Sequence, residues 1–96
     1  MTIDFNFDLT WLDGSKITEN LLDTGNPQKA SLVLSKILQM DGKVAPEKNL
    51  YWAGKLIESG LLELDEHDIK KLDSFIEKTS FISFPIIRER LREKLR

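Results

Sequence analysis

The chain has 96 residues, of which 41% are hydrophobic and 31% are charged, and it carries a formal net charge of −2. This length suits one domain, and the composition is that of a globular protein rather than a disordered one. The absence of cysteine excludes disulfide bonds, thiolate metal ligands and thiol nucleophiles.

Apolar and polar residues alternate over residues 3–11, which predicts a β-strand with one buried face. An Asp-Gly pair follows and predicts a turn. A three-residue loop over 12–14, with its glycine left-handed, pairs Leu9 with Ile17 and keeps the apolar residues on one face. We therefore predict a β-hairpin over residues 2–18. An isolated hairpin is marginal in water, so it should pack against helices.

The next segments carry apolar residues at helical spacing, bounded by proline and glycine. A short helix should follow Thr18 and end at Gly25. A longer helix should begin at Pro27, with Asn26 as its N-cap, and end at Gly42. Its apolar stripe runs through residues 30–38.

Pro46 predicts the start of another helix, which Gly60 should end. Its predicted buried side consists of Leu50, Ala53, Leu56 and Ile57. Tyr51 and Trp52 are adjacent and cannot point the same way, so we expect one of them at the edge of the core. The other interpretation is an exposed aromatic residue that binds a partner. Gly54 lies inside this helix, where a close approach of another helix would explain a glycine.

Residues 61–64 are predicted to be an extended linker, with a short strand as an option. Asp65 should then cap a helix that turns Leu72 and its apolar neighbours inward. The single histidine, His67, lies among carboxylates at this helix start. Carboxylates are favoured there by the free N–H groups and the helix dipole, and they do not converge as metal ligands must.

The last predicted helix begins at Pro85 and combines an apolar stripe with basic residues on both sides. The last nine residues hold five basic residues and two glutamates, a balance of +3. Residues 58–77 hold seven acids and two lysines, a balance of −5. The stripe consists of Ile87, Leu91 and Leu95, and the basic rows are Arg88, Arg92 and Arg96 on one side and Arg90 and Lys94 on the other.

Two arrangements of this helix are open. The stripe packs on the domain with the basic stems around it, or it binds a partner. We prefer self-association, because the acidic segment of a second copy could receive the basic helix and symmetric homo-oligomers are common. The predicted partner-binding residues are Tyr51, Trp52, Arg88, Arg90, Leu91, Arg92, Lys94 and Leu95.

The fold class expected from this order is α+β and mostly helical. A single domain over residues 1–96 would pack an N-terminal β-hairpin against a four- to five-helix array. The hairpin covers residues 2–18, the helical core residues 19–79, and the basic amphipathic C-terminal helix residues 85–96.

No catalytic constellation stands out in this sequence. There is no glycine-rich phosphate loop, and one histidine in a helix cap does not support a Ser/His/Asp arrangement. We therefore expect no enzymatic activity, no metal and no cofactor. Neither a signal peptide nor a run of the ~20 apolar residues of a membrane span is evident, which predicts a cytoplasmic protein without a membrane partner.

Three segments resemble a group of small phage- and prophage-encoded proteins without assigned activity: residues 12–17, residues 50–56, and residues 60–65 continuing to Leu72. The arginine-rich C-terminal end departs from that pattern. The resemblance implies a phage role, in assembly or in blocking a host factor, and assigns no binding or catalytic residue.

The function predicted from the sequence is a non-enzymatic protein-interaction module that self-associates or binds another protein. The alternative is a small regulator that binds nucleic acid or a nucleotide through the basic helix. Five basic residues on an acidic chain are fewer than the broad footprint that nucleic acid requires, which disfavours the alternative.

Overall fold

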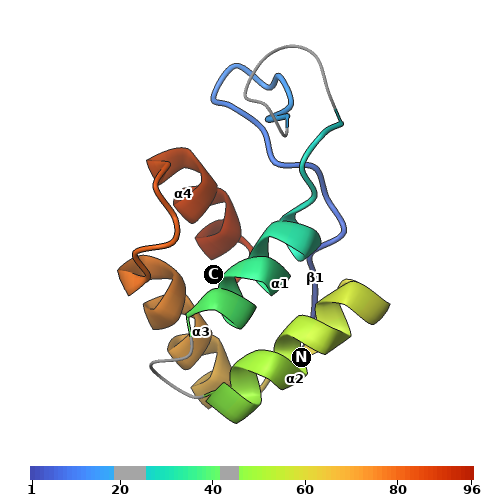
Figure 1. Cartoon of the computed structure of the whole chain (residues 1–96), viewed down its shortest axis with the longest axis vertical. Helices are drawn as coiled ribbons and strands as arrows, with labels where there is room; N and C mark the ends of the chain where they lie inside the picture. Colours follow the sequence, from blue (N-terminus) through green and yellow to red (C-terminus); the bar gives the residue numbers. More distant parts are fainter. Residues whose placement is uncertain (19–25, 42–45) are drawn as a thin grey trace.

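The computed structural model describes residues 1–18, 26–41 and 46–96. Within them the fold is α+β and mostly helical, as predicted. Figure 1 shows α1 in the middle of the helices, with α2 on one side of it and α3 and α4 on the other. The elements are β1 (Thr2–Asp4), α1 (Ala30–Met40), α2 (Pro46–Glu58), β2 (Leu61–Glu63), α3 (Glu66–Lys78) and α4 (Pro85–Glu93).

The sheet has two antiparallel strands, β1 and β2, which lie far apart in the sequence. Ile3 lies opposite Leu62, and both side chains are buried in the core. The prediction of an N-terminal β-hairpin is therefore wrong. The partner of β1 is β2, the short strand that the sequence offered as an option after α2. Its buried residue Leu62 extends the apolar surface that Ile3 presents to the core.

The predicted turn is nevertheless present beyond β1. Thr10 and Lys16 form an isolated bridge, and the Ile17 N–H donates to the Leu9 carbonyl oxygen at 2.8 Å. Gly14 has a φ of +88°, a left-handed conformation that glycine adopts without strain. The pairing of Leu9 with Ile17 and the left-handed glycine are thus confirmed, although the segment is not a continuous hairpin.

The start of α1 depends on the N-terminal segment. The Ala30 N–H donates to the Phe7 carbonyl oxygen at 2.9 Å, and the Ser31 N–H donates to that of Phe5 at 3.0 Å. These carbonyls satisfy N–H groups that a helix start otherwise leaves free. The predicted start at Pro27 is wrong, since Pro27 is extended and bridges Thr18. The short helix predicted over residues 19–25 and the helix end at Gly42 lie outside the described residues.

The buried side of α2 differs from the prediction by part of a turn. Trp52, Ala53 and Leu56 are buried, whereas Leu50 and Ile57, both predicted to be buried, are exposed. Asn49 takes part in the buried side, because its amide donates to the Asp41 carbonyl oxygen at 2.6 Å. No described atom that could crowd the helix lies within 4 Å of a Cβ placed at Gly54, so the expected close approach there is not made by the described chain.

The ends of the later helices follow local rules. The Asp65 side chain accepts the Asp68 N–H at 2.7 Å, which confirms the predicted cap of α3. Pro85 occupies the first turn of α4, as predicted.

Between α2 and β2, Gly60 has a φ of +74°, and a Cβ there would collide with the Asn6 side chain. A glycine is therefore needed where β2 begins.

Candidate functional site

The C-terminal helix α4, predicted as the main contact surface, packs on its own domain. Ile87, Leu91 and Leu95 are buried, and Leu91 has no exposed surface. Of the two arrangements left open by the sequence, the structure has the one in which the apolar stripe joins the core. A partner therefore cannot reach Leu91 or Leu95 without displacing the helix.

Arg88 is bound to the backbone where α3 ends. Its guanidinium donates to the carbonyl oxygens of Ile76, Glu77 and Ile82, each at 2.6 Å, and to that of Thr79 at 3.3 Å. The last carbonyls of a helix have no partner within the helix, and a guanidinium with five donors can serve several of them. Arg88 thus joins α4 to the end of α3.

Arg90 and Lys94, on the other basic row, face the N-terminal segment. The Arg90 guanidinium donates to the carbonyl oxygens of Thr10 and Trp11, both at 3.1 Å. The Lys94 Nζ lies 5.2 Å from the centroid of the Phe7 ring, a cation–π arrangement. Arg90 therefore holds the start of the turn against α4, and Lys94 contacts the chain just before the turn.

Arg92 pairs with an acid on α3. Its Nε and Nη2 donate to the two carboxylate oxygens of Asp73, at 2.8 and 3.1 Å. This bidentate hydrogen bonding by the Arg92 guanidinium holds the pKa of the Asp73 carboxyl below its ordinary value. The acidic segment predicted to receive the basic helix of a second copy is thus engaged by the basic helix of the same chain.

The Arg92–Asp73 pair predicts a pH dependence of stability. Because the folded pKa of Asp73 lies below the unfolded value of about 3.9, the pair stabilises the folded state fully above that value and loses its effect as the pH falls through the folded pKa. We expect Asp73→Asn to be less stable than the unmodified chain near neutral pH, with the difference shrinking as the pH falls below about 4. Urea unfolding at stepped pH values measures this difference. Arg92→Met should flatten the profile in the same way, and a difference that is constant with pH would contradict the assignment.

The two aromatic candidates on α2 separate as adjacent helical residues must. Tyr51 is 63% exposed, whereas Trp52 is 6% exposed and belongs to the core. Lys55 lies over the Tyr51 ring, with its Nζ 5.8 Å from the ring centroid. Of this pair, only Tyr51 is accessible to a partner.

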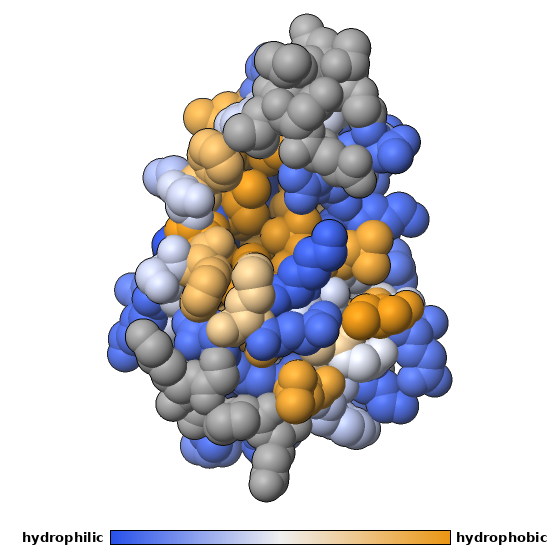
Figure 2. Space-filling model, viewed as in Figure 1, coloured by the Kyte–Doolittle hydropathy of each residue, from blue (hydrophilic) through white to orange (hydrophobic). Residues whose placement is uncertain are grey.

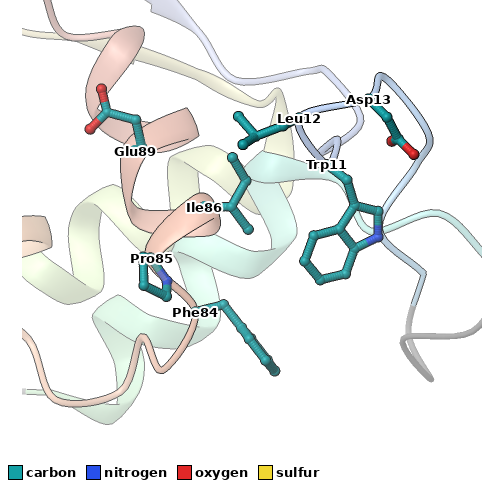
Figure 3. A pocket seen from close by; sticks show the side chains of 7 residues that line it. All are labelled: Trp11, Leu12, Asp13, Phe84, Pro85, Ile86 and Glu89. Atoms are coloured by element: carbon teal, nitrogen blue, oxygen red, sulfur yellow. The ribbon is translucent and has the colours of Figure 1, made fainter.

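The structure contains an apolar hollow that the sequence did not indicate. Figure 3 shows its walls: Trp11 and Leu12 from the turn segment, and Phe84, Pro85 and Ile86 from the start of α4. These five residues are called the apolar hollow below. It is open to solvent, has a volume of about 710 Å³, and lies where hydrophobic side chains gather at the upper left of Figure 2.

Local contacts fix the shape of the apolar hollow. The Trp11 and Phe84 rings meet edge to face, with centroids 6.5 Å apart and an interplanar angle of 82°. The Arg90 guanidinium donates to the Trp11 carbonyl oxygen at 3.1 Å and so restrains the backbone of Trp11. In the turn, the Asp13 carboxylate accepts both the N–H and the hydroxyl of Ser15, which also lowers the pKa of Asp13.

Two carboxylates lie at opposite margins of the apolar hollow, Asp13 on the turn and Glu89 on α4, and both point away from it (Figure 3). Glu89 also accepts a hydrogen bond from Arg96 at 2.8 Å. The surface of the hollow itself is almost wholly apolar, so it can accommodate a bulky apolar side chain, and a cation on the same partner would lie at its acidic margins. One signal of this site was visible in the sequence, because Leu12 is an apolar residue in a turn, and it is 87% exposed.

Other candidate chemistry is sparse in the described part of the chain. No group of three or more histidine, aspartate or glutamate side chains there is arranged to hold a metal ion, and His67 is exposed. None of the described helices is long and apolar enough to cross a membrane.

Comparisons with known proteins give no assignment. No protein-family model matches the chain, and no characterised protein or solved structure matches it either. The phage-related role implied by the resemblance therefore stays a prediction. Any function has to be inferred from the surface of the molecule itself.

Proposed function

We propose that this chain is a non-enzymatic protein-interaction domain that binds a partner protein through the apolar hollow. The observation that carries the proposal is the exposure of Leu12 next to Trp11 and Phe84 in one concave surface. An exposed apolar surface is unfavourable in water, and concave surfaces lined by aromatic residues are typical of binding sites. A partner side chain in the hollow would remove this surface from water.

The two carboxylates beside the hollow support a particular kind of partner. Asp13 and Glu89 place negative charge at opposite margins of an almost wholly apolar surface. A segment that carries a bulky apolar residue with lysine or arginine nearby would complement both features. The C-terminal helix then acts indirectly, because Arg90 holds the carbonyls of Thr10 and Trp11 and so positions the turn.

The contacts of the basic helix favour this surface over the nucleic-acid alternative. Arg88, Arg90 and Arg92 donate to backbone carbonyls or carboxylates of the same chain. A phosphate backbone would have to compete with these contacts, and nucleic-acid binding depends on many free cations. The structure therefore offers no observation that favours the regulator.

Selection of a random peptide library on the intact protein tests the proposal. We expect selected peptides to carry a bulky apolar residue next to lysine or arginine. Leu12→Glu should weaken their binding by at least about tenfold, because it removes an apolar contact worth about 1.4 kcal/mol or more and places on the apolar floor a carboxylate that a bound apolar side chain would have to desolvate. Isothermal titration calorimetry measures the change.

Leu50→Glu is the matched control, since Leu50 is also exposed but lies on α2 and does not line the hollow. It should leave peptide affinity unchanged. Peptides that bind Leu12→Glu as tightly as the unmodified chain, or a library that yields no binder, would exclude the hollow as the site.

A further inference from the structure

The outer edge of β2 carries backbone groups that point away from β1. Met1 and Leu64 form a hydrogen-bonded pair, since each nitrogen donates to the other residue's carbonyl oxygen, at 3.0 and 2.9 Å. In an antiparallel ladder, such pairs alternate with non-hydrogen-bonded pairs. The N–H and C=O groups of a non-hydrogen-bonded pair point outward, that is, away from the partner strand. From the register, Leu61 and Glu63 of β2 occupy these alternate positions.

These outward groups have almost no partner within the described residues. Within those residues, the only hydrogen bond that these groups make is from the Leu61 N–H to the Ser59 hydroxyl, at 3.3 Å. A strand edge with free N–H and C=O groups is a template for another strand. A second extended segment that runs antiparallel to β2 can therefore form backbone hydrogen bonds with this edge.

A second hollow lies beside this edge, between β2 and α2. It has a volume of about 360 Å³, and its walls include Tyr51 and Lys55 from α2, Leu61 and Glu63 from β2, and Thr2 from β1. Tyr51 and Leu61 are both exposed. Backbone donors and acceptors therefore lie next to apolar side chains on this part of the surface.

We propose that a second copy of the chain pairs with this edge, so that the two β2 strands run antiparallel across a two-fold axis. With Leu62 on the axis, Leu61 lies opposite Glu63 of the second copy, and the outward groups of both residues meet as hydrogen-bonded pairs. The two sheets then form one sheet of four strands. The contact is self-complementary, as a two-fold interface must be.

The charges at the edge favour this register. A pairing that set Glu63 opposite Glu63 of the second copy would bring like charges together, which destabilises a strand pair. With Leu62 on the axis, each glutamate faces a leucine instead. Within each copy the Glu63 carboxylate lies 4.0 Å from the Met1 amino group, and the Lys55 Nζ lies 3.7 Å from the Glu58 carboxylate. The charged groups beside this edge therefore have partners in their own chain, and a second copy brings no unpaired charge to the contact.

The dimer is independent of the apolar hollow, which lies on the turn segment and α4. The β2 strand has only three residues, so a few hydrogen bonds and the contacts of Tyr51 and Leu61 have to hold the two copies together. Interfaces of this small size are typically weak. We therefore expect a dimer that forms with rising concentration and dissociates on dilution.

Sedimentation equilibrium of the full chain over a range of concentrations tests the proposal. The unmodified chain should shift from monomer to dimer. Glu63→Pro removes an outward N–H without touching the hydrogen-bonded pairs of β1 and β2, and we expect it to raise the dimer dissociation constant at least about tenfold. Asp4→Pro is the matched control, because Asp4 lies directly opposite Leu61, does not line the second hollow, and carries its outward N–H on the other edge of the sheet. It should leave dimerisation unchanged.

A second pair of variants avoids the strand and so separates loss of association from loss of folding. Tyr51→Ala should weaken the dimer several-fold, whereas Leu50→Ala, the adjacent exposed residue that does not line this hollow, should not. A chain that stays monomeric at millimolar concentration would overturn the proposal. A dimer indifferent to both Glu63→Pro and Tyr51→Ala, or one abolished by Leu12→Glu, would overturn it as well.

Discussion

Replacing Arg88 by methionine is expected to lower the free energy of unfolding by about 3 kcal/mol, the upper range for hydrogen bonds to a charged group. Three of the carbonyl oxygens that accept from Arg88 lie at 2.6 Å, on Ile76, Glu77 and Ile82. They lie in the last turn of α3 and in the connection to α4. Methionine keeps most of the apolar stem but leaves these acceptors without a donor in a partly buried position.

Urea unfolding measures the effect, with two variants for comparison. Arg88→Lys should recover only part of the loss, because an ammonium group cannot reproduce the planar arrangement of guanidinium donors. Arg96→Met removes an exposed ion pair with Glu89 and should change stability by less than about 1 kcal/mol. If Arg88→Met were as stable as Arg96→Met, Arg88 would not be the link between α3 and α4.

Leu91→Ala should lower the free energy of unfolding by about 2–5 kcal/mol, the range for removal of a buried leucine side chain. Leu91 has no exposed surface and lies in the stripe that docks α4 on the domain. Because this stripe is part of the core, the change should leave the dimer dissociation constant unaltered under conditions in which the variant is folded.

Leu12→Ala is the comparison, since it removes the same atoms from a residue that is 87% exposed. Its free energy of unfolding should change by less than about 0.5 kcal/mol. Thermal or urea unfolding measures the effect on stability, and sedimentation measures the effect on association. Together they show whether the apolar stripe of α4 is part of the core or a contact surface. A stable Leu91→Ala variant that no longer associates would show that the stripe is a contact surface rather than core.

Features that depend on neighbouring residues were predictable from the sequence. Asp65 caps α3, Pro85 begins α4, and Gly14 allows the turn that pairs Leu9 with Ile17. Each of these rests on the geometry of a few consecutive residues, which the amino-acid types largely determine.

Features that depend on distant residues were not predictable. The partner of β1 is β2, although the Asp13-Gly14 turn nearby offered a local alternative. The start of α1 moves from Pro27 to Ala30 because the carbonyls of Phe5 and Phe7 accept the first N–H groups. Nothing in residues 26–30 indicates that these carbonyls lie there.

The candidate site was missed for a similar reason. Its walls come from residues 11–13 and 84–89, and no periodicity connects segments so far apart. The basic residues of α4 were visible, but their partners were not. A pattern of arginines reports charge, whereas Arg88 and Arg90 act here mainly as donors to particular backbone carbonyls.

The pairing of β1 with β2 also determines when the protein can fold during its synthesis. Met1 and Leu64 are hydrogen bonded across a separation of 63 residues, and Arg90 reaches Trp11 across 79. A nascent chain therefore exposes Ile3, Phe5 and Leu9 until β2 has left the ribosome. Contacts of such long range slow folding compared with a helical bundle of local contacts. The N-terminal apolar face is thus open to chaperones and to aggregation until β2 has been synthesised and has emerged.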